Sequence, residues 1–283
     1  MKMSINLHRF LHKRVILICL LFWLVFMLLL FVSGSVFGSF FTGIKERWVY
    51  GILGTVSAFG TTYLFLHFEK KKLIDIGLGW QKNTITKFIV GLALGLAIFI
   101  LILCIFFIFT DLQLQRSHEQ FTGYSFLGYL TIIPLALMEE VAFRGYPLIS
   151  LQKKFGFRAT QLILAIAFAL YHIVQGWSIP VALLGPGIWA FVFGLAAIWS
   201  KGIAVPTGIH VALNVIQPLI GMKSGTYVSV WMLDHPKVVS AQMLAKTETV
   251  GFIISFLILA GALVFTEVYI RKLKKLGFSS QAL

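Results

Sequence analysis

Two adjacent acidic residues, Glu139 and Glu140, lie inside an apolar run that extends from Tyr124 to Ala142. A charged side chain near the centre of a membrane helix costs roughly 2.5–3.5 kcal/mol on insertion scales. Of the 10 Asp and Glu residues in the chain, all the others lie at or beyond the ends of apolar runs. Ionisable residues inside a membrane span are functional candidates by default, so we expect chemistry at this pair.

Helix geometry predicts different roles for the two carboxylates. Glu140 and Arg144 are four residues apart, so they share one helical face and can pair. Glu139 points roughly 140° away from Arg144 on a helix of about 3.6 residues per turn. We therefore expect Arg144 to neutralise Glu140 and to fix the helix end, while Glu139 remains able to act as a general base. A purely structural acid–base clamp is the alternative for Glu140 and Arg144.

Two later apolar runs carry the other candidate residues. Phe168 and His172 are one helical turn apart, as are His210 and Asn214. Of the 7 His residues, only His172 and His210 lie well inside apolar runs. A Glu with a His can deprotonate water, and a His with an Asn can donate hydrogen bonds to an oxyanion. Alternatively, Glu139 and the two His residues could hold Zn²⁺.

Three motifs, taken together, resemble those of the CAAX-protease and bacteriocin-processing family (CPBP, or Abi), which includes the type II CAAX prenyl endopeptidases. The motifs are Glu139-Glu140-x-x-x-Arg144, Phe168-x-x-x-His172 and His210-x-x-x-Asn214. Their order and separation match the family, and the resemblance covers roughly residues 124–218. It implies an intramembrane endopeptidase whose catalytic core is a helical bundle.

The resemblance also implies a role for each matching position. Glu139 and His172 would activate water, and His210 and Asn214 would form the oxyanion site. The family is commonly described as metalloproteases, but a metal-free glutamate mechanism is also argued for it, so the cofactor is either none or Zn²⁺. Structural support would come from Glu140, Arg144 and Phe168.

The resemblance leaves the biological role open. Prenylated CAAX substrates are eukaryotic and archaeal, whereas bacterial members are linked to bacteriocin immunity, peptide maturation or scaffolding. We expect a membrane protein or membrane peptide as substrate. We also expect a multi-pass protein of a bacterial plasma membrane, possessing a role in bacteriocin processing or self-immunity.

Composition predicts an all-α polytopic membrane protein. Hydrophobic residues make up 59% of the 283 residues and charged residues only 12%, whereas soluble chains carry about 25% charge. The apolar runs lack the alternation of a membrane β-barrel. We predict about eight transmembrane helices, at residues 15–35, 48–67, 88–110, 124–146, 159–175, 180–200, 201–218 and 249–270.

Three regions follow from these spans. Residues 1–123 would hold N-terminal spans, 124–218 the catalytic core, and 219–283 an external loop, a last span and a basic tail. Residues 147–158 combine apolar and basic side chains, which favours a segment lying on the membrane surface. Because Glu139 and His172 must meet, either that segment re-enters the membrane or the next span begins later than residue 159.

The net charge of +14 does not indicate nucleic acid as a partner. The basic residues cluster beside apolar runs, which suits anionic lipid and membrane topology. When the N-terminus is placed inside, most of the 24 Lys and Arg residues fall on the inner side. We therefore expect both termini in the cytoplasm and residues 219–248 outside.

Two other functions fit the same polar residues. A proton-coupled transporter or channel also uses buried Glu and His, but the sequence has no paired repeat of broken helices. A non-catalytic membrane scaffold could keep the same fold.

The charge bias gives a topological prediction. A reporter fused after Leu283 should report a cytoplasmic location, since inner segments carry most of the basic residues. An external location of this reporter would contradict the predicted orientation.

Overall fold

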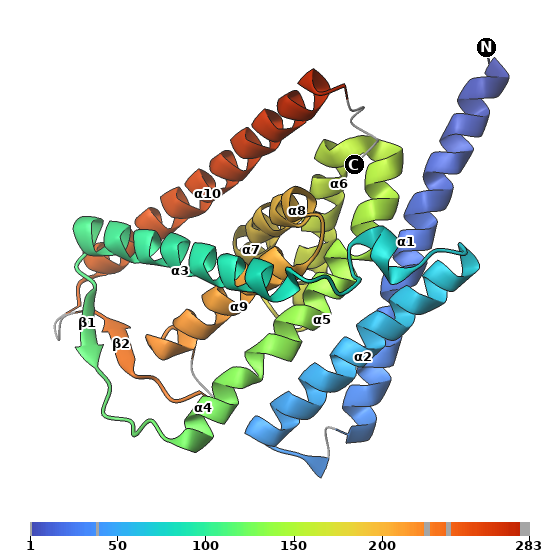
Figure 1. Ribbon diagram of the computed structural model, residues 1–283. Coiled ribbons are helices and arrows are strands. Elements are labelled where there is room, and N and C mark those ends of the chain that lie inside the picture. The colour runs from blue at the N-terminus through green and yellow to red at the C-terminus, as the bar shows by residue number, and fades with distance from the viewer. Residues whose placement is uncertain (1, 38–39, 224–226, 236–238, 278–283) are drawn as a thin grey trace.

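The structure is a computed structural model that describes residues 2–37, 40–223, 227–235 and 239–277, with side chains from Arg14 onward. Within these ranges the chain is a bundle of helices with one small pair of strands (Figure 1). The all-α polytopic fold predicted from composition is confirmed.

Among the described residues, six stretches of helix are long and apolar enough to cross a membrane, so the predicted number of about eight is approximate. The fourth and fifth predicted spans lie within one stretch, Gly123–Val174. The seventh corresponds to a helix of 16 residues, which is short for a span. The six stretches are Arg14–Phe37, Ile44–Phe68, Thr84–Phe109, Gly123–Val174, Ile179–Ser200 and Ala241–Lys275.

The helices follow one another along the chain with short connections. Their bounds are α1 Lys2–Phe37, α2 Ile44–Phe68, η2 Leu73–Ile76, α3 Thr84–Phe109, α4 Gly123–Leu130, α5 Ile132–Arg144, α6 Tyr146–Val174, α7 Ile179–Ala182, η3 Leu183–Gly187, α8 Ile188–Ser200, α9 Ala204–Leu219 and α10 Ala241–Lys275.

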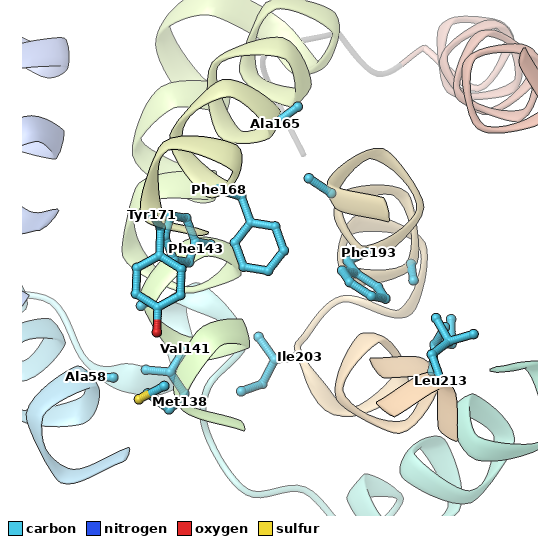
Figure 2. Packing of buried hydrophobic residues seen from close by; sticks show 14 of the residues in the cluster. Ala58, Met138, Val141, Phe143, Ala165, Phe168, Tyr171, Phe193, Ile203 and Leu213 are labelled. Atoms are coloured by element: carbon cyan, nitrogen blue, oxygen red, sulfur yellow. The ribbon is translucent and has the colours of Figure 1, made fainter. Parts of the chain in front are cut away.

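The short helix α9 lies in the middle of the bundle, crossed by α3 and in contact with α5 and α8 (Figure 1). The sequence of α9 explains this position, because ten of its residues, from Val205 to Leu213 and Pro218, are buried. Figure 2 shows the largest core cluster around it, where Phe143, Phe168 and Tyr171 pack together on one side. The candidate residues on α9 are therefore held within the interior of the bundle.

Glycines set the distance between α3 and α9. A Cβ atom added at Gly91 would lie 2.2 Å from the backbone oxygen of Val205, and one added at Gly208 would lie 2.2 Å from that of Phe88. No side chain can be accommodated this close to backbone atoms. Small residues allow helix backbones to approach in this way, which is a common means of packing helices in membranes.

The helix α6 contains a sharp turn at Gly156, where φ is 73° and ψ is 169°. The residues before it are the first part of α6, and Leu148 and Leu151 on it are buried. One face of this amphipathic segment therefore packs against the protein, and its location at the membrane surface stays a prediction. The second part of α6 then carries His172.

Two short strands pair in regions that the sequence analysis treated as loops. Strand β1 (Gln113–Arg116) is antiparallel to β2 (Trp231–Asp234). The backbone N–H of Leu233 donates to the carbonyl of Ile220, directly after α9. The described part of the predicted external loop 219–248 is therefore held against the end of α9, and its last residues belong to α10.

The contact between α3 and α9 gives a prediction on stability. Gly208→Ala should lower the free energy of unfolding by about 1–3 kcal/mol, since overpacking forces the two backbones apart. The measurement is denaturant unfolding of the purified protein in detergent.

Gly60→Ala on α2 is the matched control, because a Cβ there would meet nothing within 4 Å. Ala favours helix over Gly, so this variant should be as stable as the wild type or slightly more stable. Equal stability of the two variants would contradict the close packing of α3 on α9.

Candidate active site

Glu140 is fully buried and paired with Arg144. The exposed fraction of Glu140 is 0% and that of Arg144 is 1%. Arg144 Nη1 donates to Glu140 Oε1 at 3.3 Å, the pairing that their four-residue spacing predicts. The guanidinium carbon lies 4.4 Å from the centre of the Phe168 ring and 5.1 Å from that of Phe193. These aromatic faces stabilise a cation that has few polar neighbours.

His210 contacts both carboxylates. Its Nδ1 lies 2.9 Å from Glu140 Oε1, and its Nε2 lies 3.6 Å from Glu139 Oε2. An ionised carboxylate only accepts hydrogen bonds, so Nδ1 is the donor to Glu140. The His side chain therefore ties α9 to α5 and places its second ring nitrogen against Glu139.

Aromatic rings fix the plane of the His210 imidazole. Phe193 of α8 stacks on it with ring centres 4.7 Å apart and an interplanar angle of 15°. Phe168 of α6 presents its ring nearly perpendicular to it, at 6.3 Å. Figure 2 shows Phe168 and Phe193 extending from their two helices toward the same region. Phe168 was predicted as a supporting residue, whereas Phe193 was missed because no motif marks it.

His172 has one ring nitrogen committed to its own helix. Its Nδ1 lies 2.8 Å from the carbonyl oxygen of Phe168. A carbonyl only accepts, so Nδ1 carries the proton, and in the neutral ring Nε2 is left as an acceptor. The rings of Phe168 and Trp177 flank the imidazole at 4.7 and 5.0 Å.

The structure does not bring His172 into direct contact with Glu139. Within the described residues, the ion-pair contact of Glu139 is with His210. The two side chains do not form an ion pair here, and their joint activation of water stays a prediction. The helical turn that carries His172 directs its Nδ1 to the Phe168 carbonyl, whereas His210 reaches α5 because of the close packing of α9.

Asn214 lies one turn beyond His210 on α9 and contacts a residue that the sequence analysis did not select. Lys223 Nζ lies 3.3 Å from Asn214 Oδ1. Burial lowers the pKa of the Lys223 ammonium from its ordinary value, and the nearby carboxylate of Glu139 opposes that shift. Lys223 thus interacts electrostatically with Glu139 of the site. Its sequence signal was weak, because it is a single Lys in a loop after an apolar run.

Several buried polar atoms of this cluster have no hydrogen-bond partner among the described residues. They are Glu139 Oε2, Glu140 Oε2, Arg144 Nε and Arg144 Nη2. Leaving such an atom unpaired costs about 1–3 kcal/mol, so native proteins contain few of them. Atoms of this kind also occur outside the cluster, for example at Gln152, so they describe the polarity of the cluster and do not by themselves define a site.

The candidate ligands do not fit a zinc site in the arrangement seen here. Among the described residues, no group of three or more His, Cys, Asp or Glu side chains is placed to hold a metal ion. Zinc needs donors at about 2.0–2.2 Å around one point. His210 uses Nδ1 on Glu140, and His172 lies outside ion-pair distance of Glu139. We derive no catalytic step through a metal.

Comparison with known proteins agrees with this arrangement. Residues 121–216 match the model of the family described as type II CAAX prenyl endopeptidase Rce1-like. The match confirms the resemblance to the CPBP family of intramembrane proteases. It covers about a third of the chain, from just before α4 into α9, and includes every predicted site residue. No curated protein matches the chain.

The apolar helices indicate an integral membrane protein. Within it, the segment 121–216 is similar to the type II CAAX prenyl endopeptidases. That similarity points to a peptide or protein as the kind of substrate.

The unequal burial of the two carboxylates gives a prediction on stability. Glu140→Gln should lower the free energy of unfolding by about 3–5 kcal/mol, because it leaves Arg144 buried without its counter-charge. Glu139→Gln should cost less than about 1.5 kcal/mol, because the Glu139 side chain is 15% exposed and has no Arg or Lys ion pair among the described residues. Denaturant unfolding in detergent measures both. A larger loss in the Glu139 variant would reverse the two assignments.

Proposed function

We propose that this protein is an intramembrane endopeptidase in which Glu139 is the general base that activates water. The observation that carries the proposal is that the two carboxylates have different contacts. Glu140 is committed to Arg144 and to His210 Nδ1, whereas the ion-pair contact of Glu139 among the described residues is with His210 Nε2 at 3.6 Å. A base must keep a lone pair for the proton that it abstracts, and Glu139 does so.

In the proposed mechanism, His210 acts as a hydrogen-bond donor through both ring nitrogens. In that form His210 donates Nδ1–H to Glu140 and presents Nε2–H beside Glu139. A cation held between two carboxylates and stacked on Phe193 is a preorganised donor for negative charge that develops on a substrate oxygen.

A peptide hydrolysis step follows from these groups. Glu139 takes a proton from water as the water oxygen bonds to the scissile carbonyl carbon, and the carbonyl oxygen becomes an oxyanion. His210 Nε2–H and the Asn214 amide donate hydrogen bonds to that oxyanion. When the tetrahedral intermediate collapses, the C–N bond breaks and the proton held by Glu139 passes to the leaving amine.

His172 would act beside Glu139 as a hydrogen-bond acceptor for the attacking water. Its Nδ1–H is fixed on the Phe168 carbonyl, so Nε2 of the neutral ring can accept a hydrogen bond from the water. Partial enclosure by Phe168 and Trp177 limits its contact with solvent. On this proposal His172 orients the water, while Glu139 receives the proton.

The finer biological assignment is also a proposal. The family description names CAAX prenyl endopeptidases, so a prenylated peptide is one candidate substrate. Processing of a bacteriocin, or immunity to one, is the other. We place the protein in a bacterial plasma membrane with both termini in the cytoplasm. Residues 1–123, 124–218 and 219–283 remain our proposed division into N-terminal spans, catalytic core and C-terminal region.

The experiment is cleavage by purified protein of two fluorogenic peptides, one with a prenylated CAAX terminus and one an unprenylated apolar peptide. Wild type should cleave at least one of them. Glu139→Gln should reduce turnover by about 10²–10⁴-fold, the contribution typical of a general base, while the protein stays folded. Lys45→Met, at an exposed residue in the first turn of α2, is the matched control and should keep full turnover.

Three results would contradict this proposal. Unchanged turnover in Glu139→Gln would remove the general base. A cell function that Glu139→Gln still complements would favour a scaffold. One equivalent of bound zinc, together with reversible loss of turnover on chelation, would favour a metalloprotease in which Glu139, His172 and His210 hold the ion after rearrangement.

A further inference from the structure

The contact between Lys223 and Asn214 depends on how α9 ends. Gly221 has a left-handed backbone, with φ of 75°. Its N–H donates to the carbonyl of Pro218 at 3.1 Å, and the N–H of Met222 donates to that of Gln217 at 2.8 Å. This pair of hydrogen bonds is the Schellman motif, which closes a helix and reverses the chain direction. The turn brings Lys223 back beside α9.

The chemistry of the two side chains fixes the orientation of the Asn214 amide. A Lys ammonium has three donors and no acceptor, so it can contact only the amide oxygen of Asn. The 3.3 Å contact is indeed from Nζ to Oδ1. The amide NH₂ therefore points away from Lys223. Without such a partner an Asn amide can rotate by half a turn and present its oxygen instead of its donors.

Three effects act on the Lys223 ammonium. Burial lowers its pKa and is the largest of them, Glu139 opposes that shift, and Arg47 adds to it. The Arg47 guanidinium is itself held over the Tyr227 ring, 4.4 Å from its centre. Glu139 is thus the acidic group that favours the charged form of Lys223.

We propose that Lys223 is a positioning residue that holds the Asn214 amide with its N–H donors available to the oxyanion. This inference rests on the proposed function, and it adds a residue beyond the 121–216 segment that matches the family. The Asn214 amide oxygen would repel the oxyanion, whereas an amide N–H stabilises it. The orientation of the Asn214 amide therefore decides whether this side chain stabilises or destabilises the oxyanion. The effect should therefore appear in kcat rather than in KM.

The test is a double-mutant cycle on turnover of the two fluorogenic peptides. Lys223→Met should lower kcat by roughly 10- to 100-fold with little change in KM, and Lys223→Arg should restore part of the loss because it also donates. Asn214→Ala should lower kcat by about 10²–10³-fold. In the Asn214→Ala background, Lys223→Met should cause no further loss, because its target is gone.

Two results would overturn the proposal. One is a full additional loss of kcat from Lys223→Met in the Asn214→Ala background, which would mean that Lys223 acts independently of Asn214. The other is wild-type kcat in Lys223→Met. Lys45→Met controls for removal of a positive charge near the same end of the bundle.

A second cycle separates this proposal from the proposed function. If wild type cleaves neither peptide, the proposed function fails, and the contact is then tested by the stabilities of the same four proteins. The effects of Lys223→Met and Asn214→Ala on unfolding should be non-additive, as expected for residues in contact. Additive effects would show that the two side chains do not interact and would overturn the inference.

Discussion

The buried ion network of Glu140, Arg144 and His210 is the constraint on which the rest of the site depends. Removing a charge from water costs several kcal/mol, so a fully buried carboxylate is stable only with close partners. Glu140 has two, Arg144 on its own helix and His210 on α9. Phe168 and Phe193 cover this network on the sides not occupied by charge. The interaction therefore fixes the register of α5 against α9.

Two adjacent carboxylates acquire different properties from this constraint. Consecutive residues of a helix point about 100° apart, so only one of them can face the Arg that lies four residues later. The other is directed to the partly exposed side of the cluster. In this arrangement one acid neutralises the buried cations, and its neighbour keeps a lone pair that can accept a proton.

The packing of α9 converts this local pairing into a site. Gly91 and Gly208 let α3 approach closely, and this contact holds His210 at a defined depth. The Schellman turn after Leu219 brings Lys223 back to Asn214. Both features are backbone effects at glycine, and together they position the two ends of the polar face of α9.

Much of the site could be predicted from the sequence because its residues are spaced by helical turns within apolar runs. The pairing of Glu140 with Arg144 follows from spacing alone. The contact of His210 with both acids does not, because it depends on how helices distant in sequence pack. The pattern Gly91-x-x-x-Gly95 facing Gly208-x-x-x-Ala212 was a usable signal for that packing. Lys223 and Phe193 carry no periodic signal. The fourth predicted span corresponds to α4 with α5, and the fifth to the part of α6 after the turn at Gly156.

The central claim is that Glu140 and His210 form one energetic unit that leaves Glu139 free. The most direct measurement is a double-mutant cycle on the free energy of unfolding, using Glu140→Gln, His210→Gln and both together. We expect a coupling energy of about 1–3 kcal/mol for this pair and a clearly smaller one for Glu139→Gln with His210→Gln. Additive effects for Glu140 and His210, or a larger coupling for Glu139, would contradict this account.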